Sequence, residues 1–224
     1  MWQTLTSISM TVWLLMATGL IAAGVLIYIL SVLLPRLRHG REGERKVQHL
    51  LESIKNNANI PFHDLLLPTA GGHTTQIDHL LISTRGIFVI ETKSHYGVIK
   101  GNAQSKYWKQ IAANYTHDFY NPLMQNASHV RHLRNLLRQI PAEWFISIIV
   151  FTDAESLNIS TQCDGKTLLL SDLSTELKRY PRIIERRQLA GIAATIRKAD
   201  IRNPLARIKH VMHARRTARQ SKNK

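Results

Sequence analysis

The stretch TTQIDHLLISTRGIFVIETKSHYGVIKG, residues 74–101, contains two apolar runs joined by the dipeptide Thr84-Arg85 and a glycine. Runs of strand length around so short a connection predict a β-hairpin, with strands at 74–83 and 86–93. Both runs are apolar at successive positions over part of their length. Such strands are typical of a central sheet that is covered by helices on both faces.

Four polar residues interrupt these runs, and the hairpin is expected to bring them together. With the dipeptide at the turn, Asp78 lies opposite Glu91. Gln76 then lies opposite Lys93. Side chains alternate along a strand, so the two members on each strand share a face, and directly opposed Cβ atoms lie about 5 Å apart. The four groups therefore form one compact square, as long as the register does not slip by one residue.

Two adjacent carboxylates repel each other, and a divalent cation would relieve that repulsion. The oxygens of Asp78 and Glu91 are hard ligands that suit Mg²⁺ or Mn²⁺. Lys93 can position or activate an attacking water, or stabilise charge that develops on a phosphate. This set predicts phosphodiester hydrolysis. The alternative is a structural ion pair, in which Lys93 only neutralises the two acids.

Hydrophobic periodicity and turn residues predict further elements on both sides of the hairpin. Helices are expected at 42–55, 121–139, 172–179 and 185–198. Additional strands are expected at 60–67, 97–101, 145–152 and 166–170. The polar and aromatic residues 102–120 are expected to form an ordered loop. This order of elements predicts an α/β domain.

Four segments together resemble the nuclease-related domain (NERD) family, a branch of the PD-(D/E)XK nuclease-like superfamily. They are GREGERKVQHLL at 40–51, the hairpin at 74–101, Trp108 with Gln110, and NPLMQNASHV at 121–130. The resemblance spans roughly residues 40–152. It implies a restriction-endonuclease-like αβββαβ core with a central mixed sheet flanked by helices.

The resemblance also implies roles for individual residues. Asp78 and Glu91 would be the metal-binding acids, and Lys93 the catalytic lysine. Glu44 would be the additional acid that many superfamily members carry in the first helix, and Gln76 a polar residue at or next to the metal. By itself, Glu44 has another interpretation, because an acid in a first helical turn favours the positive end of the helix dipole.

Gln125 and His129 lie four residues apart on the helix predicted after Asn121, so they share one face. That face can line the cleft and contact the substrate backbone. A solvated polar face is the alternative.

The segment 1–35 contains no charged residue and no histidine, and 8–34 is almost entirely apolar. A run of this length exceeds the roughly 20 residues that span a bilayer. It is predicted to be an anchor that contacts lipid. The alternative is a cleaved signal peptide, although such a peptide would carry a basic N-terminal region and a shorter apolar core. Basic residues follow directly, at Arg36, Arg38, Arg41, Arg45 and Lys46. The positive-inside rule then predicts a single-pass protein of the inner (cytoplasmic) membrane, with the N-terminus outside and the soluble domain in the cytoplasm.

The formal net charge is +15, which favours an anionic partner. Residues 178–224 hold 15 of the 30 Lys and Arg and only two acids, Glu185 and Asp200. This tail can clamp nucleic acid, contact anionic lipid, or serve as a solvated extension. A single cysteine, Cys163, excludes an intrachain disulfide framework.

These observations predict four regions: an anchor at 1–35, a basic linker at 36–43, a nuclease-like domain at 44–175 and a basic helical tail at 176–224. The predicted function is that of a membrane-anchored, metal-dependent nuclease that acts on DNA or RNA. The alternative is a catalytically silent module of the same fold that binds nucleic acid or the membrane surface. A membrane-surface scaffold built on the basic tail is a third, weaker possibility. The oligomeric state is not predicted.

Overall fold

The computed structural model describes residues 2–160 and 165–222. Cys163 and the last two residues of the predicted tail therefore lie outside the described residues. The chain divides into two compact units, with the boundary between Glu42 and Gly43.

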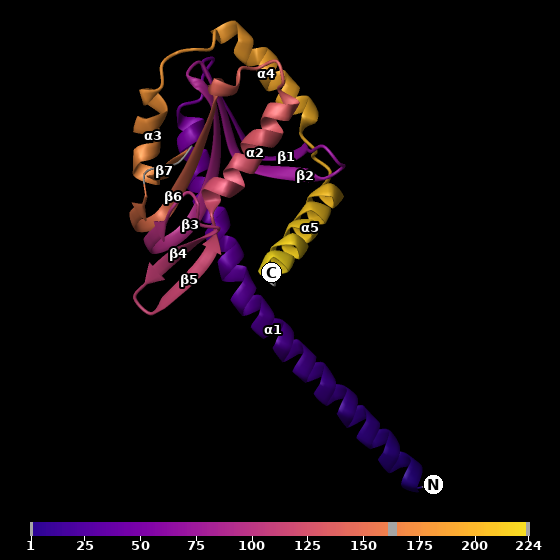
Figure 1. The fold of residues 1–224 in the computed structure, drawn as a ribbon. Coiled ribbons are helices and arrows are strands. Elements are labelled where there is room, and N and C mark those ends of the chain that lie inside the picture. Colours follow the sequence, from indigo (N-terminus) through magenta and orange to yellow (C-terminus); the bar gives the residue numbers. More distant parts are fainter. Residues whose placement is uncertain (1, 161–164, 223–224) are drawn as a thin grey trace. The chain divides into compact units, whose positions relative to one another are not determined.

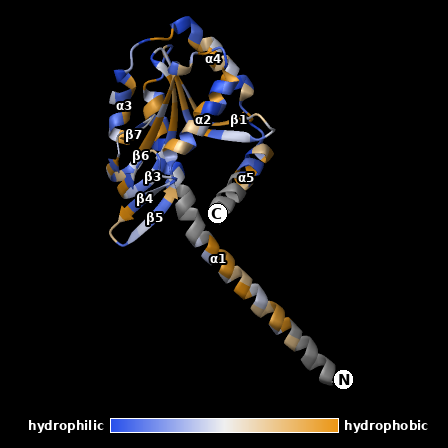
Figure 2. Ribbon diagram, in the orientation of Figure 1, coloured by the Kyte–Doolittle hydropathy of each residue, from blue (hydrophilic) through white to orange (hydrophobic). Residues whose placement is uncertain are grey.

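The first unit consists of the N-terminal part of helix α1 (Trp2–Ser53). Its segment Val12–Ile29 has a mean hydropathy of 2.3, and no part of the segment is buried. Figure 2 shows this segment as a largely hydrophobic stretch of the helix. By length and composition the segment can be a membrane span or a signal sequence. The residues predicted as a basic linker, 36–43, are helical. Arg, Leu and Glu, which favour helix, dominate them.

The second unit is built on one mixed seven-stranded sheet. Its strands are β1 (Asn59–Pro68), β2 (Thr74–Ser83), β3 (Gly86–Gly101), β4 (Tyr107–Ala112), β5 (Tyr115–Tyr120), β6 (Phe145–Ile159) and β7 (Lys166–Leu169). Strands β1 to β5 pair in sequence order and antiparallel, while β6 pairs parallel with both β3 and β7. β3 is longer than predicted, because it continues through an irregularity after Lys93 into the strand expected at 97–101.

The expected loop at 102–120 is instead the β4–β5 hairpin, so that prediction is wrong. Trp108 is fully buried, and its partner Phe119 is nearly so. The other residues of β5 are exposed. A strand at the edge of a sheet with a single buried side chain has no clear alternation of apolar and polar residues, which explains why its sequence looks like a loop.

Helices cover both faces of the sheet (Figure 1). They are α2 (Pro122–Leu136), α3 (Leu170–Arg179), α4 (Arg186–Ala199) and the end of α1. The last helix, α5 (Pro204–Lys222), lies at the β1–β2 end of the sheet. α2 and α4 pack with Leu80, Ile82 and Val89 in one core. The end of α1 and α3 pack with Phe88 and Ile90 in the other. The predicted α/β class, with helices on both faces of a mixed sheet, is confirmed.

Candidate active site

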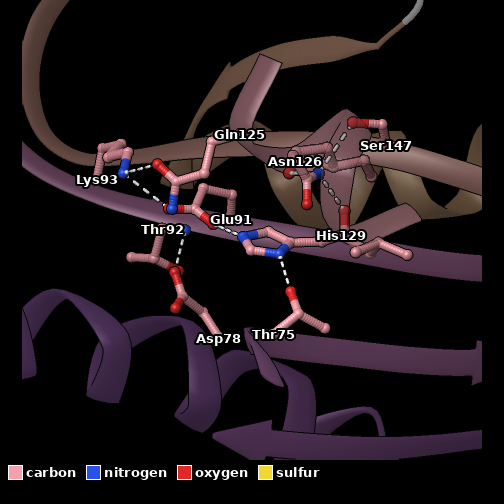
Figure 3. A network of polar contacts seen from close by, with 11 residues as sticks. Thr75, Asp78, Glu91, Thr92, Lys93, Gln125, Asn126, His129 and Ser147 are labelled. Atoms are coloured by element: carbon pink, nitrogen blue, oxygen red, sulfur yellow. Dashed lines mark hydrogen bonds and ion pairs between the residues drawn. The ribbon is translucent and has the colours of Figure 1, made fainter. Parts of the chain in front are cut away.

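The candidate site lies where β2 and β3 separate. Ser83 lies opposite Gly86 and His79 opposite Ile90, which is the register predicted from the turn. The ladder of backbone hydrogen bonds ends at that last pair. One residue further along β2, the carboxylate of Asp78 accepts a hydrogen bond of 2.9 Å from the backbone N–H of Thr92 (Figure 3). A side-chain oxygen has thus replaced a backbone acceptor.

The regular alternation of side chains also breaks at Asp78. Ile77 and Leu80 pack in the same core, although regular alternation would place residues three apart on opposite faces. β1 is interrupted at the same level, since its pairing with β2 skips Asp64. Asp64 has a φ of 52°, in the left-handed region. Asp78 therefore leaves the regular pleat and reaches along the sheet toward β3.

Glu91 and Lys93 lie two positions apart on β3 and face α2 together. Lys93 Nζ donates to Glu91 Oε1 at 2.7 Å and to Gln125 Oε1 at 2.9 Å. Gln125 Nε2 donates to the same Glu91 oxygen at 2.7 Å. The three side chains thus close a triangle of hydrogen bonds. Glu91 is almost fully enclosed, and Lys93 keeps a fifth of its side chain exposed.

His129 lies one turn after Gln125 on α2 and reaches the second oxygen of Glu91. Its Nε2 is 3.4 Å from Glu91 Oε2. Its other ring nitrogen is 2.7 Å from the hydroxyl of Thr75 on β2. The structure therefore places the two residues that were predicted to line the cleft, Gln125 and His129, against Glu91.

Two asparagines fix α2 in the position that this geometry needs. Asn121 caps the helix by accepting from the Leu123 backbone N–H at 2.9 Å. Asn126 is fully buried, and its amide donates to the Val89 carbonyl at 2.8 Å and to Ser147 Oγ at 2.9 Å. These bonds join the helix directly to β3 and β6. Side-chain amides thus hold α2 against the two strands beside the site.

Glu44 enters from α1. A Cβ atom at the neighbouring Gly43 would lie 2.1 Å from Ser94 Oγ and 2.7 Å from Thr152 Oγ1, so a larger residue there would force these side chains or α1 to shift. Glu44 is near enough for its charge to raise the pKa of both Asp78 and Lys93, although it is not the largest influence on either.

Gln76 is not part of this cluster. Its amide donates to Asp64 Oδ1 on β1 at 2.8 Å, so the predicted contact of Gln76 with Lys93 is wrong. The break at Asp78 turns the preceding residues away from the predicted face, and Gln125 takes the expected position beside Lys93. A role for Gln76 in substrate binding stays a prediction.

Comparison with known proteins identifies the fold family. The sequence model of the nuclease-related domain family matches residues 39–152, just over half of the chain. The chain belongs to the NERD family. It is also 30% identical over 202 residues to an uncharacterized protein of Bacillus anthracis, across 87% of this chain and 93% of that protein. No solved structure matches the chain significantly.

The two acids of this NERD domain have pKa values that are shifted in opposite directions. Desolvation, followed by the charge of Glu91, raises the pKa of Asp78 well above its ordinary range. Burial also opposes ionisation of Glu91, but Lys93 and His129 outweigh it and lower the pKa of Glu91 to about 2. Glu91 is therefore the ionised partner of Lys93, and Asp78 is the carboxyl whose ionisation the folded protein opposes.

Lys93 is held in its charged form. Burial acts to lower the pKa of Lys93, but Glu91, Asp78 and Glu44 together raise it. Near neutral pH, the side chain is therefore an ammonium group with its protons in place. It can donate hydrogen bonds and stabilise negative charge, but it has no lone pair with which to accept a proton.

The Asp78–Glu91 pair offers two carboxylates to a divalent cation. Among the described residues, no group of three or more His, Cys, Asp and Glu side chains is arranged to hold a metal ion. Asp78 and Glu91 therefore remain the candidate ligands. Magnesium usually takes one or two carboxylates and completes its shell with water and substrate phosphate. The carboxyl of Asp78 beside Glu91 fits such a cation.

Thr75, Thr92 and Asn126 are members of the site that the sequence did not reveal. Thr92 contributes only its backbone N–H, so no residue type could have indicated it. Thr75 and Asn126 act as partners of other site residues, and alternation along β2 gave Thr75 no reason to face α2 until the break at Asp78 was known.

Proposed function

We propose that this NERD protein is a metal-dependent phosphodiesterase that cleaves nucleic acid. One observation carries the proposal: a second buried carboxyl, Asp78, lies beside the ion pair that Glu91 forms with the ammonium group of Lys93. A purely structural ion pair would leave no such acid. The net charge of +15 suits a polyanionic substrate.

The proposed roles follow from the contacts of each side chain. Asp78 and Glu91 would hold Mg²⁺ or Mn²⁺, which supplies a Lewis acid and an activated water when bound. Lys93 stays protonated, so it donates a hydrogen bond to a phosphate oxygen and stabilises the charge that develops there. Gln125 orients Lys93 through its carbonyl oxygen. Glu44 adds a negative charge that favours both the cation and the protonated Lys93.

A catalytically silent module that binds nucleic acid is the second candidate. It is favoured by the closed triangle of Lys93, Glu91 and Gln125, in which two of the three donors of the ammonium group are already engaged. In that case the site would be structural, and binding would depend on surface cations alone.

The two candidates differ in a cleavage assay on the full-length chain in detergent. Single-stranded and duplex DNA and RNA are incubated with Mg²⁺, Mn²⁺ or a chelator. We expect metal-dependent cleavage that falls about a hundredfold or more in Asp78→Asn and Lys93→Met. Lys100→Met, on the exposed part of the same strand, is the matched control and keeps full activity. Substrate binding without cleavage under every metal condition would support the silent module instead.

A second readout does not depend on turnover. Because a ligand that binds only the folded state raises its stability, Mg²⁺ is expected to raise the unfolding temperature of the wild type and of Lys100→Met. It should leave that of Asp78→Asn unchanged. Equal shifts in all three proteins would contradict the assignment of Asp78 as a ligand.

We also propose that the apolar segment Val12–Ile29 anchors the protein in a membrane, with the nuclease-like unit in the cytoplasm. The exposure of its apolar side chains along the whole segment supports this role. The basic residues directly after it support the orientation. A reporter fused to the C-terminus should be active only in the cytoplasm and should sediment with membranes. Export of the reporter would contradict the orientation, and release after cleavage near Pro35 would indicate a signal peptide.

A further inference from the structure

Helix α5 rests on the β1–β2 end of the sheet through polar side chains. Arg207 donates to Asp64 Oδ2 at 2.6 Å and to the Asp64 carbonyl at 2.8 Å. His210 Nδ1 lies 2.8 Å from Thr74 Oγ1. The ring of His213 stacks on that of His73 with 4.8 Å between centroids. Arg207, His210 and His213 are spaced by three residues, so one polar stripe of α5 makes all three contacts.

The apolar side chains of α5 lie on the opposite stripe and are exposed. The exposed fractions are 74% for Leu205, 57% for Ile208, 41% for Val211 and 54% for Met212. A surface helix ordinarily buries its apolar stripe and leaves polar residues in solvent. α5 does the reverse, and four large apolar side chains are left without a partner among the described residues.

The positive charge of the sequence around this apolar stripe favours one kind of partner. From residue 201 to the C-terminus, the sequence has eight Lys and Arg and no acid. Phosphate backbones attract such cations but provide nothing for an apolar stripe to bury against. A second copy of α5 would cover the stripe but would bring two strongly basic helices together. An acidic lipid surface satisfies both features, because the acyl boundary takes the apolar side chains and the headgroups take the cations.

We infer that α5 is an interfacial helix that binds bilayers containing acidic phospholipids. Leu205, Ile208 and Met212 enter the boundary between headgroups and acyl chains, and Lys209 lies next to them at the surface. The inference rests on the proposed membrane anchor in one respect. The anchor would hold the second unit, which contains α5, near the lipid surface and so raise its effective concentration there. The contact itself is separate from the anchor and from the catalytic cluster.

The test places an environment-sensitive fluorophore on Ile208→Cys in full-length protein that also carries Cys163→Ser, so that the label has a single site. The protein is reconstituted in nanodiscs of phosphatidylcholine, with or without phosphatidylglycerol. We expect a blue shift of the emission only with phosphatidylglycerol, and a decrease of that shift as salt is raised. The same label on Gln104→Cys, in the exposed β3–β4 connection, should not respond.

A second variant removes the apolar stripe without touching the docked face. Leu205→Gln combined with Met212→Gln should abolish the blue shift at position 208, while circular dichroism and nuclease activity remain those of the parent. Nuclease activity is measured on every sample, so loss of the proposed catalytic function would be seen independently of the lipid response.

Three results would overturn the inference. One is an unchanged emission on acidic nanodiscs that hold the anchored protein. Another is a blue shift that appears without lipid and grows with protein concentration, which would indicate a second copy. The third is a blue shift with an oligonucleotide but not with lipid. If the chain fails to enter nanodiscs, the anchor proposal is wrong, and acidic vesicles added to the same labelled chain decide the role of α5.

Discussion

Replacement of Lys93 by methionine should destabilise the second unit through a single buried charge. Methionine keeps most of the apolar stem of lysine, so packing changes little and the ammonium group is what is lost. Glu91 is then left almost fully enclosed, with His129 and Gln125 as its remaining partners. Burial, no longer opposed by Lys93, raises the pKa of Glu91 in the variant.

The size of the effect follows from the pKa of Glu91. A fall from the ordinary value of 4.5 to about 2 corresponds to roughly 3 kcal/mol of preference for the ionised form in the folded protein. Lys93 is the largest of the favourable influences on Glu91. We therefore expect Lys93→Met to lower the free energy of unfolding by about 3 kcal/mol at neutral pH, in the range measured when one partner of a buried ion pair is removed.

The pH dependence has a defined sign. The folded-state pKa of Glu91 lies below its unfolded value, so the stabilisation is fully present above about pH 4.5 and is lost as pH falls toward 2. The difference in stability between wild type and Lys93→Met should therefore shrink across that window. It should stay constant from pH 6 to 8.

The assay is urea unfolding of the full-length chain in detergent, followed by the change in tryptophan emission as the buried Trp108 becomes exposed. A double-mutant cycle with Glu91→Gln isolates the interaction, because the double variant leaves no unpaired carboxylate at position 91. We expect it to be more stable than the sum of the single effects predicts, by about 2 kcal/mol or more. Simple additivity, or a cost that does not change below pH 4.5, would refute the assignment of Glu91 as the ionised partner of Lys93.

Three further predictions address other parts of the site. Asp78→Asn should raise the free energy of unfolding by about 1 kcal/mol at neutral pH in the presence of a chelator, because the raised folded-state pKa of Asp78 makes its ionised form destabilising there. In urea titrations this gain should disappear below about pH 4. A variant less stable than the wild type at neutral pH would contradict the prediction. Asn126→Leu should cost about 3 kcal/mol, because buried carbonyls lose their donor, whereas the exposed Asn135→Leu should stay within about 0.5 kcal/mol in the same titration. Gly43→Ala should reduce the rate of cleavage by pushing α1 away from Ser94. Gly40→Ala is the control and should leave that rate unchanged, because a Cβ atom at position 40 would meet nothing within 4 Å. Equal cleavage rates for the two variants would argue against the close approach of α1.

The sequence predicted the register of the β2–β3 hairpin because that register depends on local features. A two-residue connection between two apolar runs allows few pairings, and each one-residue slip would expose a core side chain. The core positions from His79 to Ser83 and from Gly86 to Ile90 therefore follow from the sequence. The Asp78–Glu91 pairing followed only approximately, because it lies just beyond the last regular pair.

The strand break at Asp78 could not be predicted, because it depends on groups from three strands. Asp64 takes a left-handed conformation on β1, Asp78 leaves the pleat on β2, and the N–H of Thr92 on β3 bonds to the Asp78 carboxylate. The arithmetic of a regular hairpin assumes that none of these events occurs. It therefore placed Gln76 beside Lys93, where the structure has Gln125 from α2.

The contribution of α2 to the site also depends on tertiary structure. The sequence indicated that Gln125 and His129 share a helical face, but a solvated face would have the same spacing. The amide of Asn126 decides the orientation, since it bonds to the Val89 carbonyl and to Ser147 and thereby fixes the rotation of the helix. Gln125 and His129 are turned toward Glu91 as a consequence.

The electrostatics of the cluster favour a site that acts on a ligand over a structural ion pair. A structural pair is complete when one cation meets one carboxylate, and Lys93 with Glu91 meets that condition. Asp78 adds a second carboxyl to this pair, and burial, followed by the charge of Glu91, raises its pKa. Such a second carboxyl lowers stability in the absence of a ligand. Binding of a positively charged ligand would remove this loss of stability. A divalent cation supplies that charge, and it can also bring a phosphate within reach of Lys93, where the proposed chemistry takes place.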